Sequence, residues 1–360
     1  MRRVSLVTRE RRRYMKLSEL GEFGLISKIR KSFSRPSPRM LLGIGDDAAA
    51  LRIAPSRTLL ATTDMLLEGV HFDLALTDPY SLGWKSAAVN ISDIAAMGGI
   101  PRFCLISLGI PAAFSVDDMT EFYRGFDTLA RIHGCLIAGG DTCASRKDLV
   151  VSITVLGESE KNALLPRSGA RPGDRIFVTG TLGDSAAGLA LLRKRSRKGS
   201  RSGRCSGNAG SGRYGAGEGR LIRKHLRPEP RVAEGRSLAR ARCASSLIDV
   251  SDGLSSDLLH ICEESGVGAE IYADAIPLSA DLLQNSRQIA TTPRDHALSG
   301  GEDYELLFTV PERKLKAFRS LGLEASEIGV IRRKKGAVLV LTDGRRTELP
   351  PKGYDHFRRR

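Results

Sequence analysis

Two adjacent carboxylates, Asp46 and Asp47, stand between apolar stretches in the segment LLGIGDDAAAL, residues 41–51. Like charges at this spacing repel each other, and the repulsion grows steeply when either group leaves water. A chain that folds the flanking residues into a core must therefore bring something to these side chains that neutralises them. Aspartates are also common at turns for purely structural reasons, so this pair alone assigns no function.

The same kind of acidic turn recurs through the chain. Aspartates follow hydrophobic segments at turns rich in glycine, serine or threonine, and besides the first pair they are Asp64, Asp93, Asp141, Asp249 and Asp252. In α/β folds, functional side chains gather at the ends of strands and helices. Oxygen ligands with almost no histidine or cysteine select a hard cation, and Mg²⁺ fits best because it leaves positions for water and phosphate. We expect more than one Mg²⁺ ion among these acids.

The hydrophobic pattern predicts a mixed α/β (α+β) protein. Alternating or continuous apolar runs predict strands, and apolar residues at helical spacing predict helices. The predicted strands are 57–64, 148–158, 245–250 and 304–310, and the predicted helices are 81–99 and 251–265. No internal repeat is visible, which excludes a solenoid.

The chain has 360 residues, more than one ordinary core accommodates, so we expect two domains. The junction is predicted near residue 165, where the Pro- and Gly-rich segment PRSGARPGD precedes a new strand. This division gives an N-terminal domain over 15–165 and a C-terminal domain over 166–357. Residues 1–14 are predicted to be a disordered basic arm, and the low-complexity Gly/Ser/Arg segment 193–220 a disordered insertion.

The net charge of +15 resembles that of a nucleic-acid-binding protein, but it is unevenly distributed. Residues 1–14 hold six arginines against one glutamate, residues 193–220 hold nine basic residues against one glutamate, and residues 358–360 are all arginine. The remainder is close to neutral, so we expect only non-specific contact with nucleic acid, through these segments. No apolar stretch reaches the length of a membrane helix, and no secretory signal is visible. Six scattered cysteines without metal-ligand spacing favour a cytoplasmic protein.

Several catalytic classes are excluded by missing patterns. The chain has neither a P-loop nor a dinucleotide-binding fingerprint, and no trusted nucleophile or general base. The Gly-rich turn in VTGTLGDSAAGLALL opens a helix and could offer backbone N–H groups to an anion. Arg167 could pair with a phosphate, and the turn LSGGEDYELLF would present Glu302 or Asp303 to a ligand. His71 alone is more typical of a packed or surface histidine.

Together these motifs resemble one family, the thiamine-monophosphate kinases. The similarity runs in order from about Glu22 to Phe357 and leaves out the two tails and the insertion. The segments that carry it are GIGDDAA, TTDMLLEGVHF, AVNISDIAAMGG, AGGDT, RSGARPGD, TGTLGDSAAGLA, HLRPEPR, IDVSDGLSSDL, ALSGGEDYELLF and KGYDHF. The wider superfamily includes aminoimidazole ribonucleotide synthetase, which shares the Gly-Asp-Asp and Gly-Gly-Asp motifs.

The resemblance implies a fold and a reaction. The fold is the two-domain aminoimidazole ribonucleotide synthetase-like fold, in which two N-terminal domains pair strands across a homodimer into a barrel-like core beside a C-terminal α/β domain. The reaction converts ATP and thiamine monophosphate to ADP and thiamine diphosphate by direct in-line, Mg²⁺-assisted transfer. One alternative is another ATP-dependent enzyme of the superfamily, such as aminoimidazole ribonucleotide synthetase. A second is an RNA-associated protein that uses the basic segments.

The resemblance also implies roles for individual residues. The Mg²⁺ ligands would be Asp47, Thr62, Thr63, Asp64, Asp93, Asp141, Asp249 and Asp252. The nucleotide contacts would be Gly140, Asp141, Arg167 and Ser251, and the thiamine phosphate would meet His71, Glu302 and Tyr354. Position 62 is often serine in the family, and threonine keeps the hydroxyl. No residue is expected to act as general acid, general base or nucleophile, since an acceptor phosphate is already ionised near neutral pH.

Overall fold

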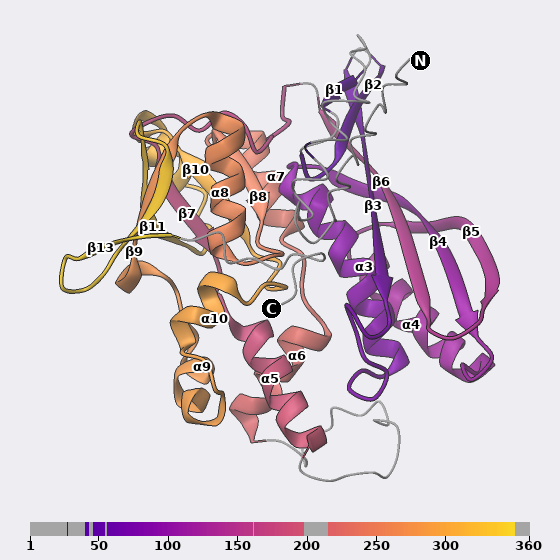
Figure 1. Cartoon of the computed structure of the whole chain (residues 1–360). Coiled ribbons are helices and arrows are strands. Elements are labelled where there is room, and N and C mark those ends of the chain that lie inside the picture. The colour runs from indigo at the N-terminus through magenta and orange to yellow at the C-terminus, as the bar shows by residue number, and fades with distance from the viewer. Residues whose placement is uncertain are drawn as a thin grey trace, which may run out of the picture. The chain divides into compact units, whose positions relative to one another are not determined.

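The computed structural model describes residue 27 and residues 40–349, apart from 43–45, 55, 161 and 198–214. The predicted basic arm 1–14, much of the predicted insertion 193–220 and the predicted substrate residue Tyr354 lie outside the described residues. The described chain forms two β-sheets with helices packed on them (Figure 1), which confirms the mixed α/β prediction.

The first sheet has six strands in the order β1-β2-β3-β6-β4-β5. They are β1 (Met40–Leu42), β2 (Ala49–Ala54), β3 (Arg57–Leu67), β6 (Val150–Glu160), β4 (Ile100–Pro111) and β5 (Leu136–Ser145). Strands β4 and β5 are parallel, and the other neighbours are antiparallel. The strands predicted at 57–64 and 148–158 correspond to β3 and β6.

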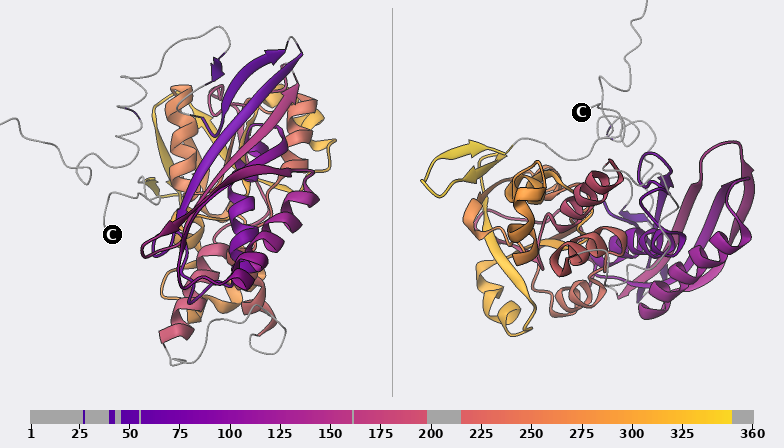
Figure 2. Two further views of the ribbon diagram at one scale, coloured as in Figure 1. Left: turned by 90° about the vertical axis from the view of Figure 1, so that its right-hand side faces the viewer. Right: turned by 90° about the horizontal axis from the view of Figure 1, so that it is seen from below.

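Helices α3 (Pro79–Ala96) and α4 (Val116–Ile132) cover one face of this sheet, behind the strands in the left view of Figure 2. Helix α3 begins where the Asp78 carboxylate accepts the N–H of Ser81 at 2.9 Å, which satisfies a free backbone donor. Gly83 and Gly125 let the two helices touch, because a Cβ at either position would meet a backbone oxygen at 1.9 Å.

The opposite face of the first sheet carries apolar side chains that no described residue covers. Met65 of β3 is 56% exposed, Phe103 of β4 47% and Leu136 of β5 58%. Phe103 and Leu136 pair directly in the β4–β5 ladder, so they share this face. The alternation along β3 sends Leu60, Thr62 and Leu66 to the covered side and Met65 to the open side.

The second sheet has seven strands in the order β13-β12-β9-β11-β7-β10-β8. They are β13 (Arg346–Glu348), β12 (Gly336–Val340), β9 (Gly268–Tyr272), β11 (Ala325–Arg332), β7 (Arg175–Thr179), β10 (Leu306–Val310) and β8 (Ser246–Asp249). Strands β12 and β9 are parallel, and the other pairs are antiparallel. The strands predicted at 245–250 and 304–310 correspond to β8 and β10.

The remaining helices pack either on the two faces of this sheet or on one another in a separate apolar cluster. They are α5 (Asp184–Arg197), α6 (Ala216–Leu226), α7 (Val232–Ala241), α8 (Leu254–Ser265), α9 (Ala280–Asn285), α10 (Pro293–Ser299) and α11 (Leu315–Arg319), with the 3₁₀ turns η1 (Ala273–Ala275), η2 (Ser286–Gln288) and η3 (Glu312–Lys314). The predicted helix 251–265 corresponds to α8. On one face the rings of Phe177, Phe308 and Phe318 pack together with their centroids within 5.7 Å of one another.

Helix α3 is buried along most of its length because it also contacts α7 and β8. The indole Nε1 of Trp84 donates to the carbonyl of Pro228 at 2.8 Å. Arg236 of α7 makes a two-point ion pair with Glu160 of β6, each contact 2.7 Å long, and donates to the Gly98 carbonyl. The sheets draw on residues 40–160 and 175–348, and the boundaries 15–165 and 166–357 remain predictions.

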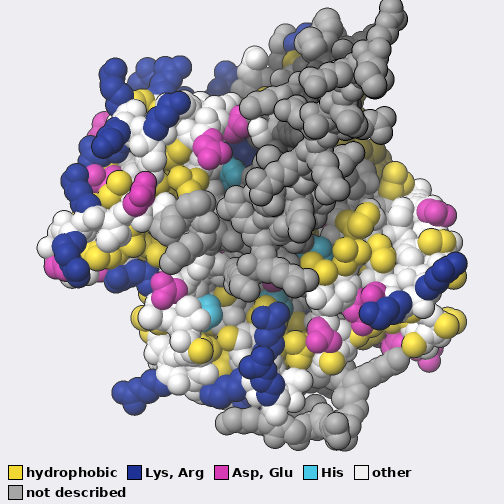
Figure 3. All heavy atoms as spheres, in the orientation of Figure 1, with side chains coloured by type: hydrophobic (Ala, Val, Ile, Leu, Met, Phe, Trp, Pro, Cys, Tyr) yellow, Lys and Arg dark blue, Asp and Glu magenta, His cyan; other side chains and the backbone are white. Residues whose placement is uncertain are grey.

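The described surface mixes basic and acidic side chains. The turn between β11 and β12 exposes four consecutive basic residues, 332–335. Arg332 pairs with Glu270 at 2.9 Å, and Arg346 lies 3.3 Å from the same carboxylate. Figure 3 shows lysine and arginine side chains along the left-hand edge with acidic groups among them. Within the described ranges, no helix is long and apolar enough to span a bilayer.

Candidate metal and nucleotide site

Three aspartates from separate elements meet in the interior of the protein. Asp47 lies just before β2, Asp93 lies in α3, and Asp249 ends β8. One carboxylate oxygen from each lies within 4.8 Å of the others. Asp47 is 8% exposed and Asp249 is 1% exposed. Three carboxylates this close together, two of them buried and the third partly buried, cannot all stay ionised unless a cation compensates them.

Hydroxyl groups and a fourth acid complete this cluster. Thr62 of β3 donates its Oγ1 hydrogen to Asp93, and Ser92 donates to the Asp249 Oδ2 at 2.6 Å. Asp64 follows Thr62 by two residues and so faces the same side of β3. Its Oδ2 atom is buried and has no hydrogen-bond partner among the described residues. Buried polar atoms are nearly always satisfied, so this oxygen marks a position suited to a ligand.

The ionisation of the acid cluster reflects its burial. Burial, with repulsion from Asp47, raises the pKa of Asp64 to about 6. Burial and the charge of Asp47 raise the pKa of Asp249 to about 8, and burial and Asp64 raise the pKa of Asp93 well above its ordinary value. A divalent cation would favour the ionised forms. The donor set consists of carboxylate oxygens, without sulfur or imidazole, and therefore fits Mg²⁺.

Arg167 supplies a protein cation to the first acidic turn. Its Nε and Nη2 lie 3.1 and 2.6 Å from the two oxygens of Asp47, a bidentate ion pair. Its backbone N–H donates to Asp46 Oδ1 at 3.1 Å. Burial and Asp47 still raise the pKa of Asp46 to about 6. The predicted phosphate partner Arg167 thus lies at the acid cluster.

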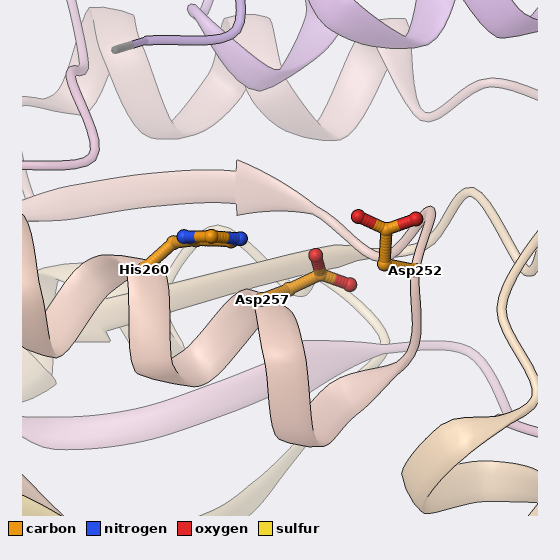
Figure 4. Close-up of side chains that lie close together, drawn as sticks. All are labelled: Asp252, Asp257 and His260. Carbon is orange, nitrogen blue, oxygen red and sulfur yellow. The ribbon is translucent and has the colours of Figure 1, made fainter. Parts of the chain in front are cut away.

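A second group of possible ligands lies beside the first, in the loop after β8 and the start of α8. Asp252, Asp257 and His260 each offer an atom within 4.8 Å of the others, and Figure 4 shows them along one side of the helix. Asp257 is 2% exposed, and burial together with Asp252 raises its pKa well above the ordinary value. Its Oδ2 accepts the N–H of Gly253 at 3.1 Å. Sequence reasoning found Asp252 but missed Asp257 and His260, although their spacing in the predicted helix put them on one face.

The predicted substrate residue Glu302 lies in a turn packed against the loop that follows β8. Its backbone N–H donates to the Ser251 carbonyl at 2.7 Å, so the turn contacts a predicted nucleotide residue. Its carboxylate lies 2.7 Å from Lys85 Nζ and 3.4 Å from His225 Nδ1. Asp303, its neighbour, instead accepts the N–H groups of Gly183 and Ser185 at the start of α5. Lys85 and His225 were not predicted.

Four other predicted residues are not brought to the acid cluster. The Thr63 side chain points to the open face of the first sheet, where it donates to the Ile153 carbonyl at 3.0 Å. Gly140 and Asp141 lie on the exposed edge strand β5. Two strands separate β5 from β3, so Asp141 is roughly 14 Å from the position of Asp64 across the sheet, at the usual strand spacing. His71 lies in the turn after β3, where its Nδ1 accepts the Leu67 N–H at 3.0 Å.

Two sequence models of protein families match the chain. The model for the "AIR synthase related protein, N-terminal domain" matches residues 45–159, and the model for the "AIR synthase related protein, C-terminal domain" matches residues 171–342. Each match falls on one of the two sheets. The fold is therefore the two-domain α/β architecture of the AIR synthase-related proteins.

Comparison with individual proteins identifies the family within this class to which the chain belongs. The thiamine-monophosphate kinase of Aquifex aeolicus is 39% identical over 343 residues, which cover 95% of this chain and 100% of that protein. The thiamine-monophosphate kinase of Escherichia coli K12 is 40% identical and covers 94% of this chain and 98% of that protein. A solved structure of AaThiL complexed with AMPPCP and TMP has a TM-score of 0.81 at 38% identity and covers 95% of this chain and 99% of that one. The chain belongs to the thiamine-monophosphate kinase family.

Proposed function

We propose that this chain transfers the terminal phosphoryl group of ATP to thiamine monophosphate and so forms thiamine diphosphate and ADP. Its relationship to thiamine-monophosphate kinases over nearly the whole chain supports this reaction rather than that of aminoimidazole ribonucleotide synthetase. In the structure, the observation that carries it is the buried acid cluster of Asp47, Asp93 and Asp249 beside Arg167. This arrangement suits chemistry between two anionic phosphates, which depends on charge neutralisation and positioning.

The acid cluster is the proposed Mg²⁺ site. We infer that Asp47, Asp64, Asp93 and Asp249 hold the metal, with Asp252 next to them. When bound, Mg²⁺ neutralises phosphate oxygens of the donor and the acceptor and lowers their mutual repulsion. The chain's own contribution is orientation: Thr62 fixes Asp93, and Ser92 fixes Asp249. Thr63 and Asp141 remain predictions from the resemblance, and their positions within one chain do not support a shared site with these acids.

We propose that transfer is direct and in line, without a phosphorylated protein intermediate. The acceptor is a phosphate monoester, whose oxygen is already ionised near neutral pH, so no general base is needed. The imidazoles near the site agree with this view. Burial lowers the pKa of His225 to about 3 and that of His260 to about 4. In a single turnover with γ-³²P-labelled ATP, the label should appear in thiamine diphosphate and not in trapped protein.

The two substrates would approach the acid cluster from different sides. Arg167, fixed by Asp47, would contact nucleotide phosphates, and Ser251 lies in the adjacent loop. Glu302 and His71 would contact the acceptor substrate, thiamine monophosphate, as the resemblance implies. AaThiL has been solved with both AMPPCP and TMP, which supports a site that accepts both substrates at once.

We also propose a homodimer formed through the open face of the first sheet. Met65, Phe103 and Leu136 are large apolar side chains, each about half exposed, on this face. Phe103 and Leu136 lie on the neighbouring strands β4 and β5, and Met65 lies on β3, which β6 separates from β4. Large apolar side chains left exposed on one face of a sheet mark a candidate interaction site. Pairing two such sheets face to face would bury these side chains and give the barrel-like core that the resemblance implies.

A substrate panel tests the proposed reaction. Purified protein with ATP and Mg²⁺ should convert thiamine monophosphate to thiamine diphosphate, detected by chromatography. Free thiamine should not react, because it lacks the phosphate that the acid cluster would hold. Turnover of other superfamily substrates, with none of thiamine monophosphate, would contradict the proposal.

A further inference from the structure

Helix α3 buries a lysine that neither the reaction nor the sequence analysis assigned. Lys85 is 2% exposed, and its Nζ lies 2.7 Å from Glu302 Oε1. A fully buried lysine is rare and needs a partner for its charge, because desolvation of an ammonium group is costly. The surrounding residues of α3 are apolar or small, and helix propensity does not require a lysine here. The side chain is therefore explained by the contact with Glu302.

The turn that carries Glu302 is strained and firmly held. Glu302 and Tyr304 both have left-handed backbone conformations, with φ of 59° and 52°, which are unfavourable for residues other than glycine. Hydrogen bonds from the N–H groups of these two residues to the Ser251 and Val250 carbonyls, 2.7 and 2.9 Å long, fix the turn. Backbone strain of this kind persists where a side chain must be held in one place.

The Glu302 carboxylate contacts buried side chains on one side and is accessible on the other. Its side chain remains 30% exposed, whereas those of Lys85 and His225 are 2% and 6% exposed. His225 of α6, which its low pKa keeps neutral, lies with Nδ1 3.4 Å from the second carboxylate oxygen and shares a hydrogen bond with Ser185 Oγ at 3.1 Å. Burial raises the pKa of Glu302, but the nearby basic groups, of which Lys85 has the largest influence, together outweigh burial and the net pKa lies below the ordinary value. The carboxylate thus has a fixed buried side and an accessible side.

One face of α3 links this carboxylate to the acid cluster. Lys85 and Ser92 are seven residues apart, which puts them on the same side of the helix. Lys85 contacts Glu302 at one end, and Ser92 donates to Asp249 at the other. Lys85 and Asp93 are separated by about 12 Å along the helix axis at 1.5 Å per residue. A ligand whose phosphate lies at the acid cluster would therefore meet Glu302 with its far end, away from the reacting phosphate.

We propose that Lys85 is a positioning residue that fixes the Glu302 carboxylate for recognition of the non-phosphate end of the acceptor substrate. The inference rests on the proposed function, since it takes thiamine monophosphate as the ligand. That molecule carries a cationic ring and an amino group, and an oriented carboxylate can attract the first and accept a hydrogen bond from the second. Lys85 acts through Glu302 and does not itself touch the substrate.

The test compares steady-state kinetics of wild type, Lys85→Met, Glu302→Gln and the double variant. Methionine matches the length of lysine without its charge. We expect the KM for thiamine monophosphate to rise about tenfold in each single variant, by analogy with loss of a charged hydrogen bond. The KM for ATP should be unchanged. The double variant should be no worse than Glu302→Gln alone, because both changes remove one interaction.

A matched control separates positioning from simple destabilisation. Arg236→Met breaks another ion pair, between the largely buried Arg236 and the partly exposed Glu160, that joins α7 to the first sheet away from Glu302. It should lower the melting temperature and leave the KM for thiamine monophosphate at the wild-type value.

Lys85→Met should also change the pH profile. Without the ammonium, burial raises the pKa of Glu302, so kcat/KM for thiamine monophosphate should fall at a higher pH on the acid side than in wild type. Arg193 and His225 are the other groups that influence this carboxylate.

The possible results distinguish failure of this inference from failure of the proposed function. Folded Lys85→Met with wild-type KM and pH profile would overturn the inference while leaving the proposed reaction intact. If Lys85→Met does not fold, the double variant, which removes both charges, is compared with Glu302→Gln. A further rise in KM in the double variant would then overturn the inference. Wild-type protein that forms no thiamine diphosphate would overturn the proposed function, and the inference with it.

Discussion

Replacing Asp249 with asparagine should stabilise the metal-free protein and remove much of its response to Mg²⁺. Asp249 is 1% exposed, and its pKa is raised from 3.8 to about 8 by burial and by the charge of Asp47. At pH 7 the metal-free folded protein therefore keeps this carboxyl protonated, whereas the unfolded chain ionises it. At about 1.4 kcal/mol for each pKa unit, this difference lowers stability by up to about 4 kcal/mol. Asparagine does not ionise in either state, so this loss of stability disappears, and its side-chain oxygen can still accept the Ser92 hydrogen bond.

The sign of the pH dependence follows from the same shift. A carboxyl whose pKa is raised on folding contributes its full stability below the unfolded value of 3.8, and stability falls as the pH rises toward about 8. Metal-free wild type should therefore lose stability between roughly pH 4 and 8. The Asp249→Asn variant should show a shallower decline, because other buried carboxyls with raised pKa values still contribute, among them Asp64 and Asp93.

Chemical denaturation with and without Mg²⁺ measures both effects. With chelator at pH 7, Asp249→Asn should be about 2–4 kcal/mol more stable than wild type. Mg²⁺ at a hundred times its dissociation constant should stabilise wild type by about 2.7 kcal/mol and the variant far less. Asp343→Asn, at an exposed acid paired with Arg345, is the control and should behave as wild type. A destabilised Asp249→Asn protein that keeps the full Mg²⁺ response would refute the assignment of Asp249 to the metal site.

Three further predictions address the fold and the assembly. Arg236→Met should cost about 2 kcal/mol in urea denaturation, less than a fully buried pair because the Glu160 side chain is 39% exposed, with activity per folded molecule unchanged; a large loss of kcat would contradict this. Gly125→Ala should cost at least about 1–3 kcal/mol, because the new Cβ would meet the Tyr80 carbonyl oxygen at 1.9 Å; an unchanged melting temperature would show that α3 and α4 are not in such contact. Leu136→Lys should convert the proposed dimer to a monomer in light scattering, and a variant that stays dimeric would place the interface elsewhere.

Local sequence patterns were sufficient to predict part of the fold and the core of the acid cluster, but not β4, α4 or β5. Periodicity identified β3, α3 and α8, and the acids Asp47, Asp93 and Asp249 stood out because each follows or ends an apolar segment. Strand alternation could also have separated Thr62 and Asp64 from Thr63, since neighbouring residues of a strand face opposite sides. The resemblance assigned all three without that distinction.

Contacts between distant segments could not be derived in this way. The position of Asp141 on an edge strand depends on the order β3-β6-β4-β5, which sequence alone did not show. The Arg167–Asp47 and Lys85–Glu302 pairs join residues more than 100 positions apart. A lysine within an otherwise apolar and small-residue helix was a visible anomaly in the sequence, but only the fold shows that its partner is Glu302.

The most direct test of the account is the rate of thiamine diphosphate formation as a function of Mg²⁺ concentration, for wild type and Asp64→Asn. Asp64 carries a buried oxygen that has no hydrogen-bond partner among the described residues, and it belongs to the proposed metal site. The account predicts no product from wild type without a divalent cation, and a loss of at least about a hundredfold in kcat in the folded variant, as expected when an electrostatic contribution to phosphoryl transfer is removed. An Asp64→Asn variant with wild-type rate and Mg²⁺ dependence would contradict the central claim that these acids form the metal site.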